Sequence, residues 1–208
     1  MKPGKFVVIE GLEGAGKSTA IRLVGELLQQ QGIEFITTRE PGGTPLAERM
    51  RSIVKSDTDE RLTPEAELLL MYASRIQLIE NVIKPALDKG IWVLGDRHDM
   101  SSLAYQGGGR QLPESLIMPI RNAVLKEFKP DLTLLMDIDP RIGLERAAAR
   151  GELDRIEKEQ IAFFDRTRAV YLKLAQQPNV RTVDASNSLP RVQDDIRMTV
   201  NDWLAEHV

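Results

Sequence analysis

The chain contains no cysteine and only two histidines among its 208 residues. Without cysteine, disulfide bonds and thiolate metal sites are excluded, and the composition is compatible with a reducing cytoplasm. His98 and His207 stand outside any HExxH or similar spacing, so neither indicates a zinc site or a histidine-based phosphotransfer. A Ser-His-Asp signature is missing as well. We therefore interpret both histidines as structural.

Long apolar runs are also missing. The first run, residues 6–9, is too short for the core of a signal peptide or for a membrane span, and no later run is long enough. The net charge of -3 provides no general attraction for a nucleic acid polymer. We therefore expect a cytoplasmic protein with neither a membrane nor a polynucleotide as partner. Its length favours a single domain, residues 1–208.

Short apolar segments alternate with longer helical patterns along the chain. We expect strands at residues 5–10, 33–38, 91–95, 131–137 and 180–183. We expect helices at residues 17–31, 46–55, 64–89, 113–128, 140–150, 157–176 and 189–207, the third with a kink allowed at Pro85. Such alternation indicates an α/β protein with a parallel sheet buried on both faces and ligands at the carboxyl ends of its strands. Residues 96–110, which end in three glycines, are expected to form a mobile or ligand-binding loop.

A glycine-rich loop lies between the first expected strand and the first expected helix. It matches GxxxxGK[ST] and comprises Gly11, Leu12, Glu13, Gly14, Ala15, Gly16, Lys17 and Ser18, followed by Thr19. The glycines of such a loop let successive backbone N–H groups surround phosphate oxygens at the helix N-terminus. Lys17 is then placed to reach the β- and γ-phosphates, and Ser18 to bind Mg²⁺. The pattern and its position together predict binding of ATP with Mg²⁺.

Two carboxylates near this loop each have two interpretations. Asp96 ends the third expected strand, where it can reach the Mg²⁺ shell as Walker-B aspartates do, or it can cap a helix. Glu13 places a negative charge inside a phosphate-binding loop, which is repulsive unless the side chain turns to a hydroxyl group or a cation. Contact with an acceptor substrate is our preferred interpretation of Glu13, and a solvated loop carboxylate is the alternative.

Arginines are concentrated in the segments expected at the ligand-binding edge of the sheet. These arginines are Arg39, Arg51, Arg75, Arg97 and Arg110. Forked guanidinium groups suit bidentate contacts with phosphate, whereas a single surface arginine is more often only a solvated charge. The clustering favours a second, anionic substrate.

A further basic group surrounds Gly151. Arg146 and Arg150 are four residues apart and share a helix face, and Arg155 follows. An exposed basic helix end, favoured by the helix dipole, is one interpretation. In the presence of a phosphate-binding loop, we prefer a lid, at about residues 146–157, that closes over the phosphates.

Five motifs follow in order along the chain: GLEGAGKST, TREPGG, GDRHD, SSLAYQGGGR and RGELDRIE. Together they resemble the bacterial thymidylate kinases, over residues 6–208. The loop has no arginine in its variable positions, which resembles the branch of the family that carries its catalytic arginines in the lid. The resemblance implies a P-loop nucleoside monophosphate kinase fold, with a five-stranded parallel sheet flanked by helices on both faces. It also implies a homodimer that phosphorylates dTMP to dTDP with ATP and Mg²⁺.

The resemblance further implies roles for individual residues. Those implied in catalysis are Lys17, Arg150, Arg155, Glu13 and Arg97, and those at the metal are Ser18 and Asp96. Those implied at dTMP are Glu13, Arg39, Glu40, Pro41, Arg51, Met71, Tyr72, Arg75, Arg97, Ser102, Tyr105 and Gln106.

Within that acceptor set, Arg51 and Arg97 would hold the phosphate, and Arg75 would hydrogen-bond thymine. Ser102 and Gln106 would read the base. Tyr105, the aromatic residue of YQGGGR, would make a third contact with dTMP. Its ring would pack on the deoxyribose and disfavour a 2′-hydroxyl group.

The chain departs from the family pattern at two positions. Met71 stands where many members have a phenylalanine that stacks on thymine, so the base would rest on Met71 or on Tyr72. Ala148 stands where some relatives have another lid arginine.

Two other functions are compatible with the P-loop alone. One is a small kinase for another nucleotide or a metabolite, and the other is a P-loop ATPase or switch protein. A GTPase switch normally has an N/T-KxD motif, which this sequence lacks. The arginine cluster favours a kinase.

Overall fold

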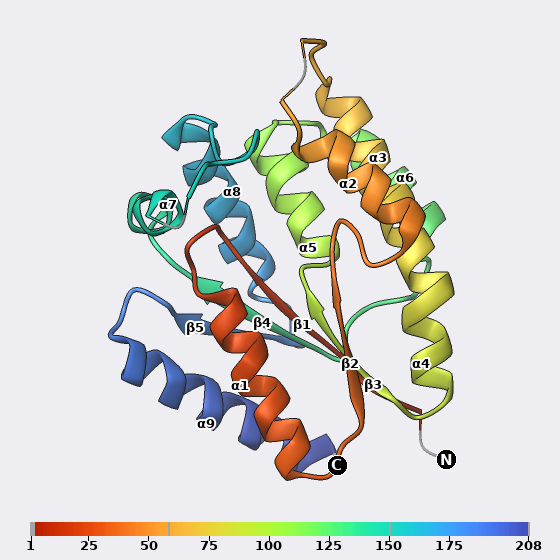
Figure 1. Ribbon diagram of the computed structural model, residues 1–208, viewed down its shortest axis with the longest axis vertical. Helices are drawn as coiled ribbons and strands as arrows, with labels where there is room; N and C mark the ends of the chain where they lie inside the picture. The colour runs from red at the N-terminus through yellow and green to blue at the C-terminus, as the bar shows by residue number, and fades with distance from the viewer. Residues whose placement is uncertain (1–2, 58, 150, 208) are drawn as a thin grey trace.

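A computed structural model describes residues 3–57, 59–149 and 151–207 (Figure 1). Five parallel strands form one sheet in the order β2-β3-β1-β4-β5. The strands are β1 (Phe6–Gly11), β2 (Phe35–Arg39), β3 (Trp92–Asp96), β4 (Leu132–Asp137) and β5 (Val180–Asp184). Each begins and ends within two residues of its expected position. The predicted five-stranded parallel sheet is therefore confirmed.

Helices cover both faces of the sheet. The α-helices are α1 (Lys17–Gln30), α2 (Pro45–Lys55), α3 (Pro64–Leu78), α4 (Lys84–Asp88), α5 (Asp99–Ser102), α6 (Glu114–Leu125), α7 (Pro140–Ala148), α8 (Ile161–Leu174) and α9 (Leu189–His207). Two π-helical segments, η1 (Ile79–Ile83) and η2 (Leu103–Gly109), join α3 to α4 and continue α5. Among the described residues, no helix is long and apolar enough to cross a membrane.

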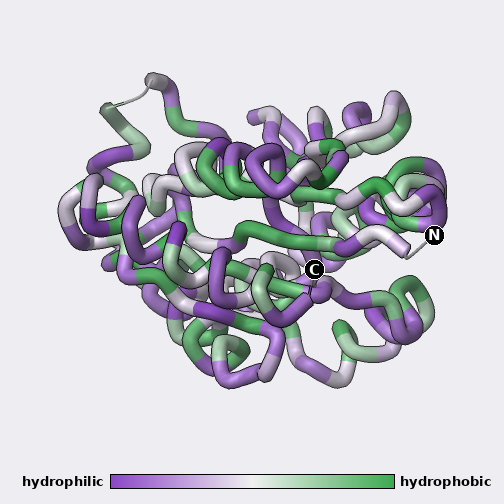
Figure 2. Tube along the Cα trace, turned by 90° about the horizontal axis from the view of Figure 1, so that it is seen from below, coloured by the Kyte–Doolittle hydropathy of each residue, from purple (hydrophilic) through white to green (hydrophobic). Residues whose placement is uncertain are grey.

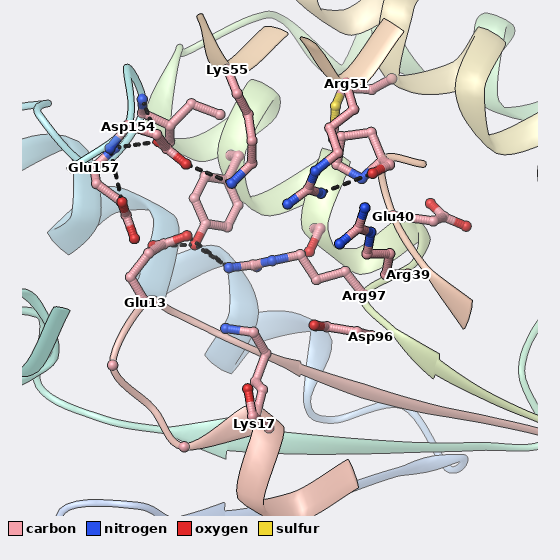
Figure 3. A pocket seen from close by; sticks show the side chains of 18 of the residues that line it. Glu13, Lys17, Arg39, Glu40, Arg51, Lys55, Asp96, Arg97, Asp154 and Glu157 are labelled. Atoms are coloured by element: carbon pink, nitrogen blue, oxygen red, sulfur yellow. Dashed lines mark hydrogen bonds and ion pairs between the residues drawn. The ribbon is translucent and has the colours of Figure 1, made fainter. Parts of the chain in front are cut away.

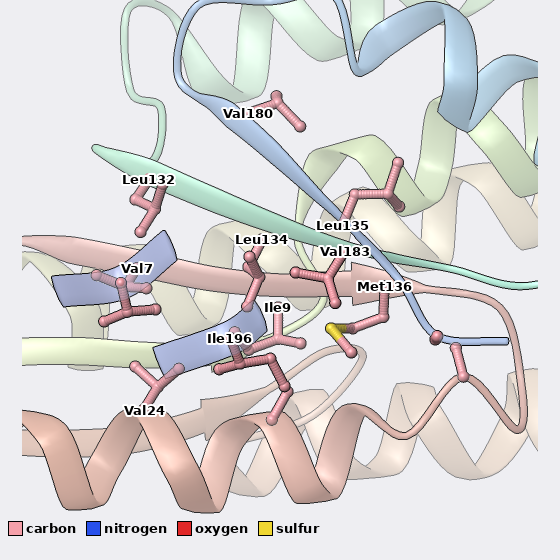
Figure 4. Close-up of a cluster of buried hydrophobic side chains, with 14 of the residues drawn as sticks. Val7, Ile9, Val24, Leu132, Leu134, Leu135, Met136, Val180, Val183 and Ile196 are labelled. Atoms are coloured by element: carbon pink, nitrogen blue, oxygen red, sulfur yellow. The ribbon is translucent and has the colours of Figure 1, made fainter. Parts of the chain in front are cut away.

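Alternate residues of β1 enter opposite cores. Val7 and Ile9 belong to the cluster that packs against α1 and α9 (Figure 4), whereas Phe6 and Val8 belong to the cluster under α3, η1, α4 and α6. All four are at most 2% exposed. This two-sided burial explains why the strands are continuous apolar runs rather than alternating ones. In Figure 2, apolar segments run through the middle of the molecule between the helical layers.

Helix starts follow the local chemistry. Thr44 and Thr63 accept hydrogen bonds from the first turns of α2 and α3, each of which has proline at its start. The long helix expected at 64–89 is helical to Asp88, but a π turn at η1 interrupts it just before Pro85. Proline cannot donate the hydrogen bond that an α-helix needs there, and a π turn is a known way to absorb such a defect.

The segment 96–110 was wrongly predicted as a loop. After Arg97 and His98 it is helical through α5 and η2, which packs closely against α8. A Cβ atom on Gly109 would lie 2.4 Å from the Phe163 ring, and one on Gly108 would lie 2.8 Å from the Arg166 carbonyl oxygen. Two of the three glycines therefore serve close helix packing, a purpose that a glycine run in the sequence does not reveal.

Two helix boundaries near the predicted lid also differ from expectation. The helix α8 begins at Ile161 rather than at residue 157, because residues 155–158 form a turn whose first N–H group, that of Arg155, donates to the Lys55 carbonyl oxygen of α2. The preceding helix, α7, ends at Ala148. Arg150, the predicted lid arginine, lies outside the described residues.

Candidate active site

A cavity of about 420 Å³ opens at the carboxyl ends of β1, β2 and β3. The predicted site residues that line it are Glu13, Gly14, Gly16, Lys17, Ser18, Thr19, Arg39, Glu40, Pro41, Arg51, Met71, Asp96, Arg97, Tyr105 and Gln106. Segments far apart in the chain thus meet in one place (Figure 3). Predicted residues that do not line it are Gly11, Leu12, Ala15, Tyr72, Arg75, Ser102 and Arg155.

The P-loop begins at the end of β1 and turns into α1. Gly14 and Gly16 have φ of 72° and 83°, and a Cβ atom on Gly14 would meet the Gly143 carbonyl oxygen at 2.0 Å. Only glycine fits such a backbone. Gly16 caps α1 without a side-chain hydrogen bond, so the first turn of the helix presents N–H groups that a phosphate can accept.

Lys17 curls back over this loop. Its Nζ donates to the carbonyl oxygens of Gly11, at 3.1 Å, and Leu12, at 2.9 Å. Burial and the nearby positive charge of Arg97 lower the pKa of Lys17 to about 8. The binding of negatively charged groups beside this amino group would therefore stabilise its charged form.

Ser18 and Asp96 both line the cavity and provide oxygen atoms. Asp96 Oδ1 is buried and has no hydrogen-bond partner among the described residues. No cluster of three or more His, Cys, Asp or Glu that could hold a metal exists in the described part of the chain. A hydroxyl group and one carboxylate suit Mg²⁺, which binds through one or two protein oxygens, phosphates and water.

Glu13 is neither solvated nor isolated. Its carboxylate accepts hydrogen bonds from Arg97 Nη2 at 2.7 Å and from the Tyr105 hydroxyl group at 2.6 Å (Figure 3). Burial opposes its ionisation, but the charges of Arg97 and Lys17 outweigh this effect and lower the pKa of Glu13. The solvated alternative for Glu13 is therefore wrong. Its carboxylate instead points toward Arg97 and Tyr105.

Arg97 has a left-handed backbone with φ of 67°, which is uncommon outside glycine. The guanidinium group is held on its other side by Ser101 Oγ at 3.1 Å and by the Tyr171 hydroxyl group at 3.2 Å. Both hydroxyl groups in turn donate to the buried carboxylate of Glu10, at 2.7 and 2.8 Å. A strained backbone maintained by this network places a cation in the centre of the cavity.

Arg39 and Arg51 supply further positive charge opposite the P-loop. Arg51 Nη1 donates to the Pro41 carbonyl oxygen at 2.9 Å, and Arg39 pairs with Glu48 at 2.9 Å. Burial and the charge of Arg39 lower the pKa of Arg51. With Arg97, these residues create a region of positive potential suited to a phosphate group.

Arg75 is fully buried behind the cavity wall. It donates to Glu40 at 2.6 Å, to Ser102 Oγ at 2.9 Å and to the His98 carbonyl oxygen at 3.0 Å. Its Nη1 makes no hydrogen bond among the described residues but lies 3.8 Å from Asp99 Oδ1, within ion-pair distance. Tyr72 turns away from the cavity and donates to Asp99. Of the two candidates for supporting a base, the structure therefore places only Met71 at the cavity.

The predicted lid segment, residues 146–157, reaches the cavity through several of its described side chains. Arg146 lines it and donates to the Ala185 carbonyl oxygen at 3.0 Å. Arg155 instead contacts the Val54 carbonyl oxygen at 2.7 Å and the carboxylate of Glu67. In this structure Arg155 thus fastens the predicted lid segment to α2 and α3 and does not line the cavity.

Five lining residues were missed by the sequence reasoning. These are Lys55, Ser101, Asp154, Ile156 and Glu157. Lys55 and Asp154 form an ion pair at 2.5 Å that joins α2 to the lid segment. The sequence shows both as ordinary charged residues 99 positions apart. The prediction from RGELDRIE used only its arginines. The acidic residues of the same motif, which include Asp154 and Glu157, would have indicated these lining residues.

The comparisons with known proteins agree with this geometry. A family model described as thymidylate kinase matches residues 9–196. The chain is 59% identical to the thymidylate kinase of Vibrio vulnificus strain YJ016 and 58% identical to that of Vibrio parahaemolyticus, covering 99% of both chains in each comparison. The similarity therefore extends through the P-loop, the arginine cluster and the lid segment.

Proposed function

Because the chain belongs to the thymidylate kinase family, we propose that it transfers the terminal phosphoryl group of ATP to dTMP, giving ADP and dTDP. The observation that carries the proposal is the shape of the cavity, which joins the P-loop to a separate group of arginines. An ATPase or switch needs no second anion site. A nucleoside monophosphate kinase does, because its acceptor is itself a phosphate.

The donor half of the cavity is the P-loop. Its N–H groups and Lys17 would hold the phosphates of ATP, and Ser18 with Asp96 would hold Mg²⁺. When bound, Mg²⁺ neutralises charge on the transferring phosphoryl group. On binding, Lys17 would exchange its bonds to the loop carbonyl oxygens for bonds to phosphate oxygens. The lid segment would exclude water, and Arg150 would add positive charge on closure.

The acceptor half contains the phosphate and sugar contacts. Arg51 and Arg97, supported by Arg39, would hold the dTMP phosphate in line with the donor. Glu13 faces the same space, and its carboxylate would accept a hydrogen bond from the acceptor sugar. The ring of Tyr105 is fixed by its bond to Glu13 and by Arg97 stacked 4.9 Å from the ring centre. A fixed ring suits packing on deoxyribose and exclusion of a 2′-hydroxyl group.

The base would lie deeper, among Met71, Gln106 and the wall formed by Arg75. Met71 offers an apolar surface for the base. The Nη1 group of Arg75 lies 3.8 Å from Asp99 Oδ1, so Arg75 would support the base from behind the lining residues. Ser102 accepts a hydrogen bond from Arg75 and would act by orienting it. This arrangement accounts for Ser102 and Arg75 lying behind the lining residues.

We further propose that the chain works as one domain, in the cytoplasm and as a homodimer. Leu46 and Ile53 on α2 and Leu69 on α3 are 51%, 53% and 55% exposed, and these helices pack side by side. Exposed apolar side chains on adjacent helices favour an interface with a second copy.

A coupled ADP-release assay with Mg·ATP and a panel of nucleoside monophosphates tests the function. We expect dTMP to be the preferred acceptor. Equal turnover of all monophosphates, or ADP release without any acceptor, would contradict the proposal. Lys17→Met is the control that identifies activity from a contaminating kinase.

A further inference from the structure

A buried carboxylate on α3 lies next to the acceptor half of the cavity. Glu67 is 1% exposed, and no motif in the sequence distinguishes it from a surface glutamate. Its Oε1 accepts from Gln106 Nε2 at 2.8 Å and from Arg110 Nε at 3.2 Å. Its Oε2 accepts from Arg110 Nη2 at 3.1 Å and from Arg155. Four hydrogen bonds therefore converge on one carboxylate.

Glu67 is held in its ionised form. Burial opposes ionisation, but hydrogen bonds and charge from Arg110, together with bonds from Arg155 and Gln106, outweigh it and lower the pKa of Glu67. An ionised carboxylate only accepts hydrogen bonds. A carboxamide, by contrast, has a donor end and an acceptor end of almost the same size. Next to Glu67, Gln106 must turn its NH₂ group to the carboxylate.

The other end of Gln106 is then left for a ligand. Its Oε1 is buried and has no hydrogen-bond partner among the described residues, and Gln106 is one of the residues that line the cavity. A buried acceptor without a partner is costly unless a ligand or water satisfies it. The N3–H group of thymine is a donor, whereas N3 of cytosine is an acceptor.

We propose that Glu67 is a positioning residue that sets the base selectivity of the acceptor site, by fixing the Gln106 carboxamide with its oxygen toward the base. The inference rests on the proposed function and deepens it. The N3–H group of thymine donates a hydrogen bond to the fixed Gln106 oxygen. The N3 atom of cytosine instead places a second acceptor against that oxygen. Glu67 itself does not touch the substrate.

The test compares dTMP with 5-methyl-dCMP, which have the same size and differ in the hydrogen-bonding groups at N3 and C4. In Glu67→Gln, the new carboxamide can donate as well as accept, so Gln106 is free to turn over. We expect the ratio of kcat/KM for dTMP over 5-methyl-dCMP to fall about tenfold or more, with dTMP kinase activity retained. An unchanged ratio in folded Glu67→Gln would overturn the inference.

Glu159→Gln is the matched control. Glu159 accepts a hydrogen bond from Arg110 as Glu67 does, but no hydrogen bond joins it to Gln106 in the described structure. Its ratio should equal that of the wild type. An equal fall in both variants would assign the effect to Arg110 and overturn the inference. A wild-type enzyme inactive on dTMP would instead overturn the proposed function.

A second measurement does not depend on whether Glu67→Gln folds. Wild-type protein with ¹⁵N-labelled glutamine side chains is studied by NMR, with Gln106 assigned as the carboxamide signal absent from Gln106→Met. Its N–H group should be protected from hydrogen exchange in the free protein and should stay protected when dTMP binds. Rapid exchange in either state would show that Glu67 does not hold the amide.

Discussion

Single side chains of the cavity are held by partners that the substrates would replace. Lys17 donates to two carbonyl oxygens of its own loop, and Arg97 pairs with Glu13. Such bonds keep buried polar groups satisfied in the free protein. Substrate binding would then exchange one set of hydrogen bonds for another, so the charged side chains stay oriented at little cost in free energy.

Lys17 should take up a proton when nucleotide binds near pH 8. Its pKa of about 8 leaves about half of the amino groups neutral at that pH, and bound phosphates raise the pKa. Calorimetry of a non-hydrolysable ATP analogue in two buffers with different ionisation enthalpies measures the uptake, up to about half a proton.

Lys17→Met is the comparison for this measurement. The variant should show no such uptake and almost no turnover, because it lacks the charge that bridges the β- and γ-phosphates. Proton uptake that is equal in the wild type and in Lys17→Met would assign it to another group.

At the scale of elements, the contact between η2 and α8 connects the cavity to the proposed lid segment. The segment η2 carries Tyr105 and Gln106 into the cavity, and α8 begins just after the lid segment. The two elements pack closely because glycines leave room for the Phe163 ring and the α8 backbone. The positions of Tyr105 and Gln106 at the cavity thus depend on a contact between η2 and α8.

Gly109→Ala should destabilise the protein by about 1–3 kcal/mol, because the added methyl group would overlap the Phe163 ring and Thr167 Oγ1. Urea unfolding followed by circular dichroism measures the change. Gly107→Ala is the control within the same element. Its Cβ atom would meet only the end of the Ile117 side chain, at 3.3 Å. Equal stability losses in the two variants would argue against the packing explanation.

Arg150→Ala should act mainly on the chemical step. An arginine that meets transition-state charge only on closure lowers kcat more than ground-state binding, by about 10³-fold or less if Arg146 shares the role. Single-turnover kinetics with saturating ATP and dTMP measure this step. Arg141→Ala, on the exposed face of α7, should stay within about twofold of the wild type. A rate for Arg150→Ala within about twofold of the wild type would favour the alternative interpretation, in which Arg150 is an exposed charge at a helix end.

At the scale of the whole molecule, the cavity and the exposed apolar residues of α2 and α3 occupy different parts of the surface. Lys55, at the end of α2, reaches the lid segment, while Leu46 and Ile53 of the same helix are exposed to solvent. A second copy that covers these side chains would also restrain the helix that carries Arg51.

Leu69→Glu should convert the proposed homodimer to monomers, because it would bury a charge in an apolar contact. Size-exclusion chromatography with light scattering measures the mass in solution. Met198→Glu is the control, since Met198 is 58% exposed on α9, away from α2 and α3. A dimer that persists in Leu69→Glu would place the interface elsewhere.

The sequence by itself determined the sheet, the P-loop and most of the lining residues. Continuous apolar runs specify buried strands, and GxxxxGK[ST] between a strand and a helix specifies a phosphate site, since both depend on neighbours in the chain. Parallel strands then bring their following loops to one edge, which is why residues as distant as Glu13 and Arg97 could be assigned to one site.

Only the tertiary structure decided which side chains face the cavity and which support it from behind. Tyr72 turns to Asp99 while Met71 lines the cavity, and Glu67 orients Gln106 from 39 positions away. Likewise, Gly108 and Gly109 belong to a helix contact rather than to a loop because α8 packs on them. In each case the orientation of a side chain, or the conformation of a short segment, is set by atoms from a distant part of the chain. Such a contact exists only after the chain has folded.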